Sequence, residues 1–397
     1  MNRRINSIDA VRGLCLLNIF VNHITLGALL ELSPSKIALF DSADVFVLLA
    51  GLSAFLAYGP RGAGHDFAAA RDRMWKRALT IYFANLGILA ASFAIFFIGA
   101  AGAPPPNPAL SPIDVMATAG APNYLWNVVT LQQSIGWSMV LRVYVFLMIA
   151  APLYVWLAGR RFWYPLVPAA LVWAVSGHFA IASRDSLTGE LLSMTLLPWQ
   201  LVFAAGISLG AAIVQGVALP RSRTLSAAAI LIAAGGTWLM VAGDRISPDI
   251  HLWLEARNHH FWTGASKSLQ SPLRLLNLLA LGYLVMAFAK APLIRLLHGA
   301  KPENFLCRLG RRSLHVFAFG AIFALAVDQL IWNLIAADLL VQRSPAAIVL
   351  EAGLVAAGVL GMIRIASRAG RTVPVAGDRS KAGAAVVTPT GFEPVAY

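Results

Sequence analysis

The chain has 397 residues, of which 58% are hydrophobic and 12% are charged. A soluble globular domain carries about a quarter of its residues as charged side chains, so this composition excludes a soluble domain. The formal net charge of +13 raises the question of a nucleic-acid partner. The basic residues follow a membrane topology instead of forming one basic face, which argues against nucleic acid.

Ten apolar segments follow one another, each close to the length of about 20 residues that a helix needs to cross a bilayer. They cover residues 8–30, 42–58, 78–101, 136–157, 165–182, 198–218, 224–243, 272–290, 313–336 and 346–365. The sequence therefore predicts an all-α polytopic membrane protein with about ten transmembrane helices. Lys and Arg concentrate on the cytoplasmic side of membranes, and placing the N-terminus there leaves most basic residues in inner segments. We therefore expect both termini in the cytoplasm.

The expected domain organisation is one transmembrane domain and a tail. Residues 1–365 form the domain, and residues 366–397, which are polar and rich in Gly and Ala, are expected to be a disordered cytoplasmic tail. The two cysteines, Cys15 and Cys307, lie far apart in or beside apolar segments. They provide neither a disulfide framework nor a metal-ligand spacing, so no metal site is predicted.

The first apolar segment carries three ionisable residues, Asp9, Arg12 and His23. On a helix these three lie on one face, and ionisable groups in membrane helices nearly always face the protein interior. Asp9 and Arg12 are one turn apart near the expected cytoplasmic surface. Two interpretations of this pair stand side by side: a structural ion pair, or a group in which Arg12 helps to hold an anionic cofactor at the inner mouth.

His23 lies about 16 Å further along this helix than Arg12. A neutral imidazole can take a proton from a hydroxyl group, which predicts a general base; the alternative is a structural buried histidine. A general base needs an acceptor that orients its other nitrogen. The next segment begins with Asp41 and Asp44. We expect Asp44, inside the helix, to orient His23, and Asp41 to be interfacial.

Four stretches resemble the OpgC family of membrane proteins, within the acyltransferase-3 superfamily. The first three read SIDAVRGLCLLNIFVNHI, FDSADVFVLLAGLSAFLAYG and LLPWQLVFAAGISLG, and the fourth is KSLQSPLRLLNLLALGYL (267–284) together with LGRRSLHVF (309–317). The resemblance extends in order over residues 4–365. Two positions depart from the family pattern: Asn22 replaces an acidic residue before the histidine, and Arg142 stands in WSMVLRVYVF where the family tends to have an Asp-containing start.

Members of this family modify osmoregulated periplasmic glucans with succinyl groups. The resemblance therefore implies a multi-pass acyltransferase domain over residues 1–365 in the bacterial inner membrane. It implies acyl-CoA, with succinyl-CoA as the expected donor, on the cytoplasmic side, and a periplasmic glucan or related glycan as acceptor. No permanently bound cofactor is expected. His23 matches the family's catalytic histidine, while Asp9 and Arg12 match its leading charged pair.

The donor side is expected to use Arg12 and Asp9 together with Arg73 and Arg77 of an inner basic loop. Arginine suits the phosphate groups of CoA. The alternative is that Arg73 and Arg77 are ordinary positive-inside charge.

The acceptor side is expected to use Trp199 and Gln200, which open the sixth segment, and Arg274 and Asn277, which open the eighth. Gln200 or Asn277 would stabilise the oxyanion. Arg274 would meet a carboxylate such as the free end of a succinyl group, or else extend to the membrane interface. Direct transfer and a covalent acyl-enzyme both remain open.

The alternative function is a transporter or flippase for a glycan or an acylated small molecule. Many transporters contain internal repeats, and the sequence shows none, which favours the enzyme. A membrane scaffold without chemistry would leave His23 unexplained. The sequence fixes neither the acyl group, the acceptor glycan nor the oligomeric state.

Overall fold

A computed structural model describes residues 5–24, 33–60, 65–100, 120–133, 137–184, 189, 191–218, 220–288, 290–341 and 344–368. Over these residues the chain is helical, without β-strands. The helices are α1 (Asn6–Asn22), α2 (Pro34–Ile37), α3 (Ser42–Tyr58), α4 (Phe67–Ala100), α6 (Ala121–Val129), α7 (Met139–Arg160), α8 (Leu166–His178), α9 (Leu196–Val214), α10 (Arg223–Ala242), η2 (Gly243–Arg245), α11 (Pro248–Ala256), α12 (Pro272–Ala287), α13 (Pro292–His298), α14 (Phe305–Arg311), α15 (Ser313–Ala336) and α16 (Pro345–Arg368). The expected tail lies outside the described residues beyond residue 368, and its first three residues complete α16.

Each predicted apolar segment overlaps a helix of the structure, which confirms the all-α prediction. Six described helices are long and apolar enough to cross a membrane: Phe67–Gly99, Met139–Arg160, Leu196–Val214, Arg223–Ala242, Ser313–Ala336 and Pro345–Ser367. Helices α3, α8 and α12 are apolar but shorter. The count of ten spans and the cytoplasmic position of both termini therefore stay predictions.

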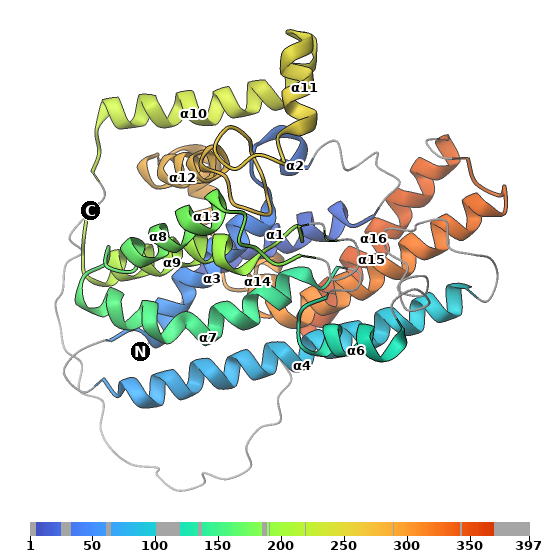
Figure 1. The fold of residues 1–397 in the computed structure, drawn as a ribbon, viewed down its shortest axis with the longest axis horizontal. Coiled ribbons are helices and arrows are strands. Elements are labelled where there is room, and N and C mark those ends of the chain that lie inside the picture. Colours follow the sequence, from blue (N-terminus) through green and yellow to red (C-terminus); the bar gives the residue numbers. More distant parts are fainter. Residues whose placement is uncertain are drawn as a thin grey trace, which may run out of the picture.

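Helices α3 and α9 pack against each other at the centre of the molecule, with α7 and α8 beside them (Figure 1). Small residues allow this close approach. A methyl group added at Gly206 of α9 would lie 2.0 Å from the carbonyl oxygen of Leu48 in α3, and one at Gly51 would lie 2.0 Å from the carbonyl oxygen of Phe203. Because association of membrane helices depends on such close packing, these glycines fix the position of α3.

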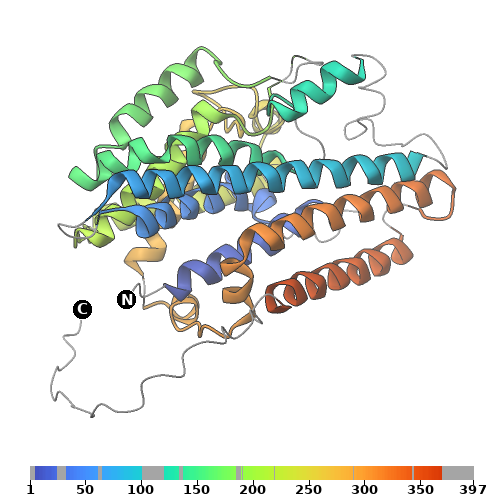
Figure 2. The same cartoon turned by 90° about the horizontal axis from the view of Figure 1, so that it is seen from below.

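Helix α1 is held between α3 on one side and α14 with α15 on the other. Figure 2 shows α15 lying along α4, with α16 against α15. The contact of α1 with α14 is backbone to backbone: a methyl group on Gly13 would lie 2.2 Å from the carbonyl oxygen of Leu306, and one on Gly310 would lie 1.9 Å from that of Asp9. This packing prevents α1 from sliding along its axis.

We expect Gly206→Ala to destabilise the protein by about 1–3 kcal/mol, because the added methyl group meets a backbone carbonyl that cannot turn away. Gly87→Ala in α4 is the matched control, since no atom lies within 4 Å of the added group. Alanine has the higher helix propensity, so this variant should unfold at the wild-type temperature or slightly above it. Thermal unfolding of the detergent-purified proteins checks both. Equal unfolding temperatures for the two variants would contradict the close contact of α3 and α9.

Candidate active site

A cavity of about 290 Å³ lies where the C-terminal end of α1, the N-terminal ends of α3 and α7 and the loops before α9 and α12 meet. Its polar wall is formed by Asn22, His23, Ser35, Asp41, Ser42, Ser193 and Lys267. Trp137, Met139, Val140 and Phe317 contribute apolar surface. Of the catalytic and substrate-binding residues predicted from the sequence, His23 is the one that lines this cavity.

The sequence Asp41-Ser42-Ala43-Asp44 forms a capping box at the N-terminus of α3. The Asp41 carboxylate accepts a hydrogen bond from the backbone N–H of Ala43 at 2.8 Å, and the Asp44 carboxylate accepts one from the N–H of Asp41 at 2.8 Å. Because each carboxylate satisfies a free amide of the first turn, the two side chains are fixed relative to the helix. They point toward different partners.

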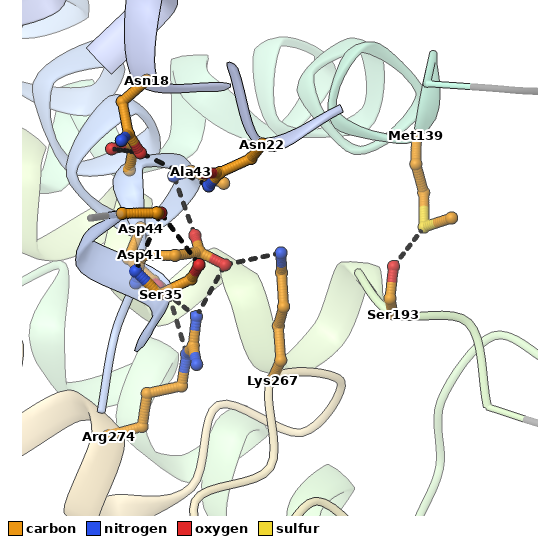
Figure 3. A network of polar contacts seen from close by, with 12 residues as sticks. Asn18, Asn22, Ser35, Asp41, Ala43, Asp44, Met139, Ser193, Lys267 and Arg274 are labelled. Atoms are coloured by element: carbon orange, nitrogen blue, oxygen red, sulfur yellow. Dashed lines mark hydrogen bonds and ion pairs between the residues drawn. The ribbon is translucent and has the colours of Figure 1, made fainter. Parts of the chain in front are cut away.

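Asp44 is fully buried and pairs with Arg274 of α12 (Figure 3). Nε and Nη2 of Arg274 reach the two oxygens of Asp44, and Nε2 of Gln270 donates to the same carboxylate at 2.6 Å. The Arg274 guanidinium also contacts Oδ2 of Asp41 at 3.2 Å and donates to the carbonyl oxygen of Leu39 at 2.9 Å. A buried ion pair with this many hydrogen bonds satisfies its charges internally.

Lys267 brings a positive charge into the cavity. Its Nζ lies 2.6 Å from Oδ2 of Asp41, and its side chain is 33% exposed (Figure 3). Burial raises the pKa of Asp41, but Lys267 and Arg274 outweigh it and hold that pKa below its ordinary value. Asp41 is therefore a carboxylate that faces an ammonium group at the cavity surface.

The His23 ring is held by stacking on Trp137. The two rings are 4.2 Å apart between centroids and 8° from parallel. Within the described ranges, neither ring nitrogen of His23 has a hydrogen-bond partner. Asp44, which was expected to orient His23, instead uses its oxygens for Arg274, Gln270 and the N–H of Asp41. The charged groups that share the cavity with His23 are Asp41 and Lys267.

The four residues predicted to bind the acceptor are not among the residues that line the cavity. Trp199 is fully buried, and its indole N–H donates to the carbonyl oxygen of Lys267 at 2.9 Å. Gln200 donates to the carbonyl oxygen of Ala169 at 2.7 Å and accepts from the Tyr154 hydroxyl. Asn277 donates to the carbonyl oxygen of Ile232 at 2.9 Å. These side chains, like Arg274, therefore make their hydrogen bonds to other parts of the protein.

A charged cluster occupies the other end of α1. Arg12 contacts Asp9 at 3.4 Å, donates to the carbonyl oxygen of Leu49 at 3.3 Å and donates to the Ser53 hydroxyl of α3. Arg311 of α14 contacts Asp9 at 3.4 Å. The predicted Asp9–Arg12 pair is therefore part of a group that joins three helices.

The remaining predicted donor-side residues, Arg73 and Arg77, lie near the start of α4. Arg73 is exposed and Arg77 is half-buried. Within the part of the chain that the structure describes, neither side chain has a hydrogen bond or an ion pair, so both remain free to meet a ligand. In the same ranges, no group of three or more His, Cys, Asp or Glu side chains is arranged to hold a metal ion.

Sequence reasoning missed Lys267 and Trp137 and underrated Asp41. The sequence does single out Lys267, because it is a basic residue in a loop expected on the periplasmic side of the membrane, where Lys and Arg are scarce. Trp137 had no such signal, since its stacking on His23 arises from tertiary packing. The assembled site offers an imidazole as proton acceptor, an ammonium group and a fixed carboxylate around one cavity, which is a set of groups suited to activating a hydroxyl.

The comparisons with known proteins give one match. The model of the family described as "OpgC protein" matches residues 3–365. No match was found among curated proteins or among solved structures. The family match covers nearly all of the described helices and includes every residue of the candidate site. The chain therefore belongs to the OpgC family.

Proposed function

We propose that this protein is an integral O-acyltransferase of the bacterial inner membrane that moves a succinyl group from cytoplasmic succinyl-CoA to a hydroxyl group of a periplasmic glucan. The observation that carries the proposal is the cavity in which His23, whose ring nitrogens have no hydrogen-bond partner among the described residues, shares a wall with the Lys267–Asp41 pair. Membership in the OpgC family supports a transferase. Six helices long and apolar enough to span a membrane support the location.

In this proposal His23 is the general base. It takes the proton of the glucan hydroxyl as the hydroxyl oxygen attacks the thioester carbonyl carbon. The electron pair of the C=O bond then moves onto the carbonyl oxygen. Lys267 stabilises this oxyanion with its ammonium group. The intermediate then collapses, the C–S bond breaks, and the CoA thiolate takes the proton from His23. Direct transfer needs no covalent acyl-enzyme, so no further nucleophile is required.

The two aspartates have separate roles in this mechanism. Asp41 keeps Lys267 at the cavity surface through the 2.6 Å ion pair. Asp44 is a positioning residue that acts through Arg274, because this arginine contacts both carboxylates. Trp199 contributes in the same way, since its bond to the carbonyl oxygen of Lys267 fixes the backbone of that residue.

The donor is proposed to bind at the opposite end of α1. Arg12 with Asp9, and Arg73 with Arg77, would hold the CoA phosphates, for which the arginine fork is well suited. Arg12 and His23 are eleven residues apart on one helix, about 16 Å along its axis. The acyl end of the donor would therefore cross the bundle beside α1 to reach His23.

His23→Gln should lower acyl transfer by about 10²–10⁴-fold, because glutamine keeps a polar side chain but cannot accept the hydroxyl proton. The measurement is mass spectrometry of periplasmic glucans from a deletion strain complemented with wild type or variant. Wild type should restore the succinyl mass, and His23→Gln should not. The control is His315→Gln, since His315 is an exposed histidine at the start of α15.

Full restoration by His23→Gln would mean that His23 has a structural role. If the deletion changes no acyl mass at all, the enzyme proposal gives way to the transporter or flippase.

Lys267→Met should lower the turnover rate by about 10²–10³-fold, because the developing oxyanion loses its cation. Lys267→Arg keeps the charge and should retain activity to within about tenfold of wild type. The assay is transfer from radiolabelled succinyl-CoA to glucan in membrane vesicles. Lys301→Met, at an exposed position, is the matched control. Equal activity of the Met and Arg variants would remove Lys267 from the mechanism.

A further inference from the structure

A second cavity, of about 270 Å³, lies next to the first. Arg142, Arg184, Thr130, Gln132 and Ser183 form its polar wall. Arg142 connects the two cavities, since its Nη2 donates at 2.6 Å to the carbonyl oxygen of Met194, a residue that lines the first cavity. A ligand that extends beyond the first cavity therefore has a second polar pocket close by.

Arg142 carries a buried positive charge for which the described residues provide no counter-ion. The residue is 3% exposed. Its Nη1 and Nη2 donate to the backbone carbonyl oxygens of Leu131 and Met194, whereas its Nε is buried without a hydrogen-bond partner. No carboxylate of the described residues forms an ion pair with it. Burying an unpaired charge costs several kcal/mol, so this position suits an arginine best when an anion is bound beside it.

The rest of the wall adds to this positive character. Arg184 is exposed and uses its Nη1 for the carbonyl oxygen of Gly189 at 2.9 Å, and its other guanidinium N–H groups have no partner among the described residues. Gln132 and Thr130 contribute an amide and a hydroxyl, joined by a 3.1 Å hydrogen bond. No acidic side chain is among the residues that line this cavity in the described ranges. Two guanidinium groups with neighbouring amide and hydroxyl groups are the chemistry that recognises a carboxylate or a phosphate.

We propose that the Arg142–Arg184 cavity is an anion-binding subsite that takes a carboxylate or phosphate group of a molecule engaged in the neighbouring cavity. The anion has two possible sources. One is the free carboxylate of a dicarboxylic acyl group, and the other is an acidic substituent on the glycan acceptor. Assigning these sources rests on the proposed function, but binding of the anion itself does not.

The first experiment measures anion binding without any activity. Purified protein in detergent is titrated with succinate, with inorganic phosphate and with neutral succinamide at constant ionic strength, and the thermal unfolding temperature is recorded. Wild type should be stabilised by succinate or phosphate but not by succinamide, as a ligand that binds the folded state requires. Arg184→Gln should raise the apparent dissociation constant at least tenfold, and this exposed position carries little risk of misfolding.

Two further variants complete this test. Arg221→Gln removes another exposed arginine, before α10, and should respond like wild type. Arg142→Lys keeps the buried charge but loses the planar fork, so it should bind the anion more weakly than wild type even if its own unfolding temperature changes. Equal titration curves for wild type and Arg184→Gln, or no response of wild type to either anion, would overturn the proposal.

The second experiment separates the two sources of the anion. Wild type and Arg184→Gln are given succinyl-CoA or butyryl-CoA, which has a chain of the same length without the carboxylate, and a neutral or an acidic glucan. If the acyl group supplies the anion, Arg184→Gln loses the preference for succinyl over butyryl with both glucans. If the acceptor supplies it, the variant loses the preference for the acidic glucan with both donors.

An unchanged pattern of preferences in the variant would contradict a role of the subsite in transfer. If wild type transfers no acyl group, the proposed function fails, whereas the binding result stands independently.

Discussion

The buried pair of Asp44 and Arg274 is the interaction on which the candidate site depends. It joins α3 to α12 across 230 residues of sequence, and the carboxylate receives a further hydrogen bond from Gln270. Breaking such a pair by removing one partner costs about 3–5 kcal/mol, since the other charge is left buried and unpaired. Because Arg274 also contacts Asp41, the same guanidinium sets the position of the carboxylate that holds Lys267. The position of Asp41 and Lys267 at the cavity therefore depends on the Asp44–Arg274 pair.

Helix α1 gives the site its second fixed element. Gly13 and Gly310 bring α1 and α14 into backbone contact, and Phe20 fills the space above Gly358 of α16. The helix therefore behaves as a rigid rod with an arginine cluster at one end and His23 at the other. In the proposed mechanism, the donor and the acceptor arrive from opposite sides of the membrane. A rigid α1 would then keep His23 in place while the acyl group moves along the helix.

The sequence predicted the helices well because a single physical signal defines them. A run of about 20 apolar residues has few alternatives to a membrane helix, so every predicted segment overlaps a helix. It also indicated His23 and the Asp9–Arg12 pair, because placing an ionisable group in an apolar membrane helix costs free energy and therefore suggests a specific role. Both signals are local in sequence.

The partners of these residues are not local, and there the prediction was less successful. Asp44 and Asp41 are three residues apart and chemically identical in the sequence. In the structure Asp44 pairs with Arg274, whereas Asp41 contacts both Arg274 and Lys267. Trp199 was expected on the acceptor side, and in the structure it is buried, with its N–H donating to a backbone carbonyl oxygen. Composition and spacing do not contain this information, because it arises when Lys267 and Arg274, more than 200 residues further along the chain, meet the N-terminus of α3.

Two buried arginines show how the same side chain serves different purposes in this protein. Arg274 contacts two carboxylates and a carbonyl oxygen, so its charge is balanced by groups of the chain itself. Arg142 is just as buried, yet it has two carbonyl oxygens and no carboxylate among the described residues. If Arg142 served packing alone, a neutral donor such as glutamine would bridge similar carbonyls without the desolvation cost of a charge. The contrast between a compensated and an uncompensated arginine, a few helices apart, is the physical reason to look for an anion in the second cavity.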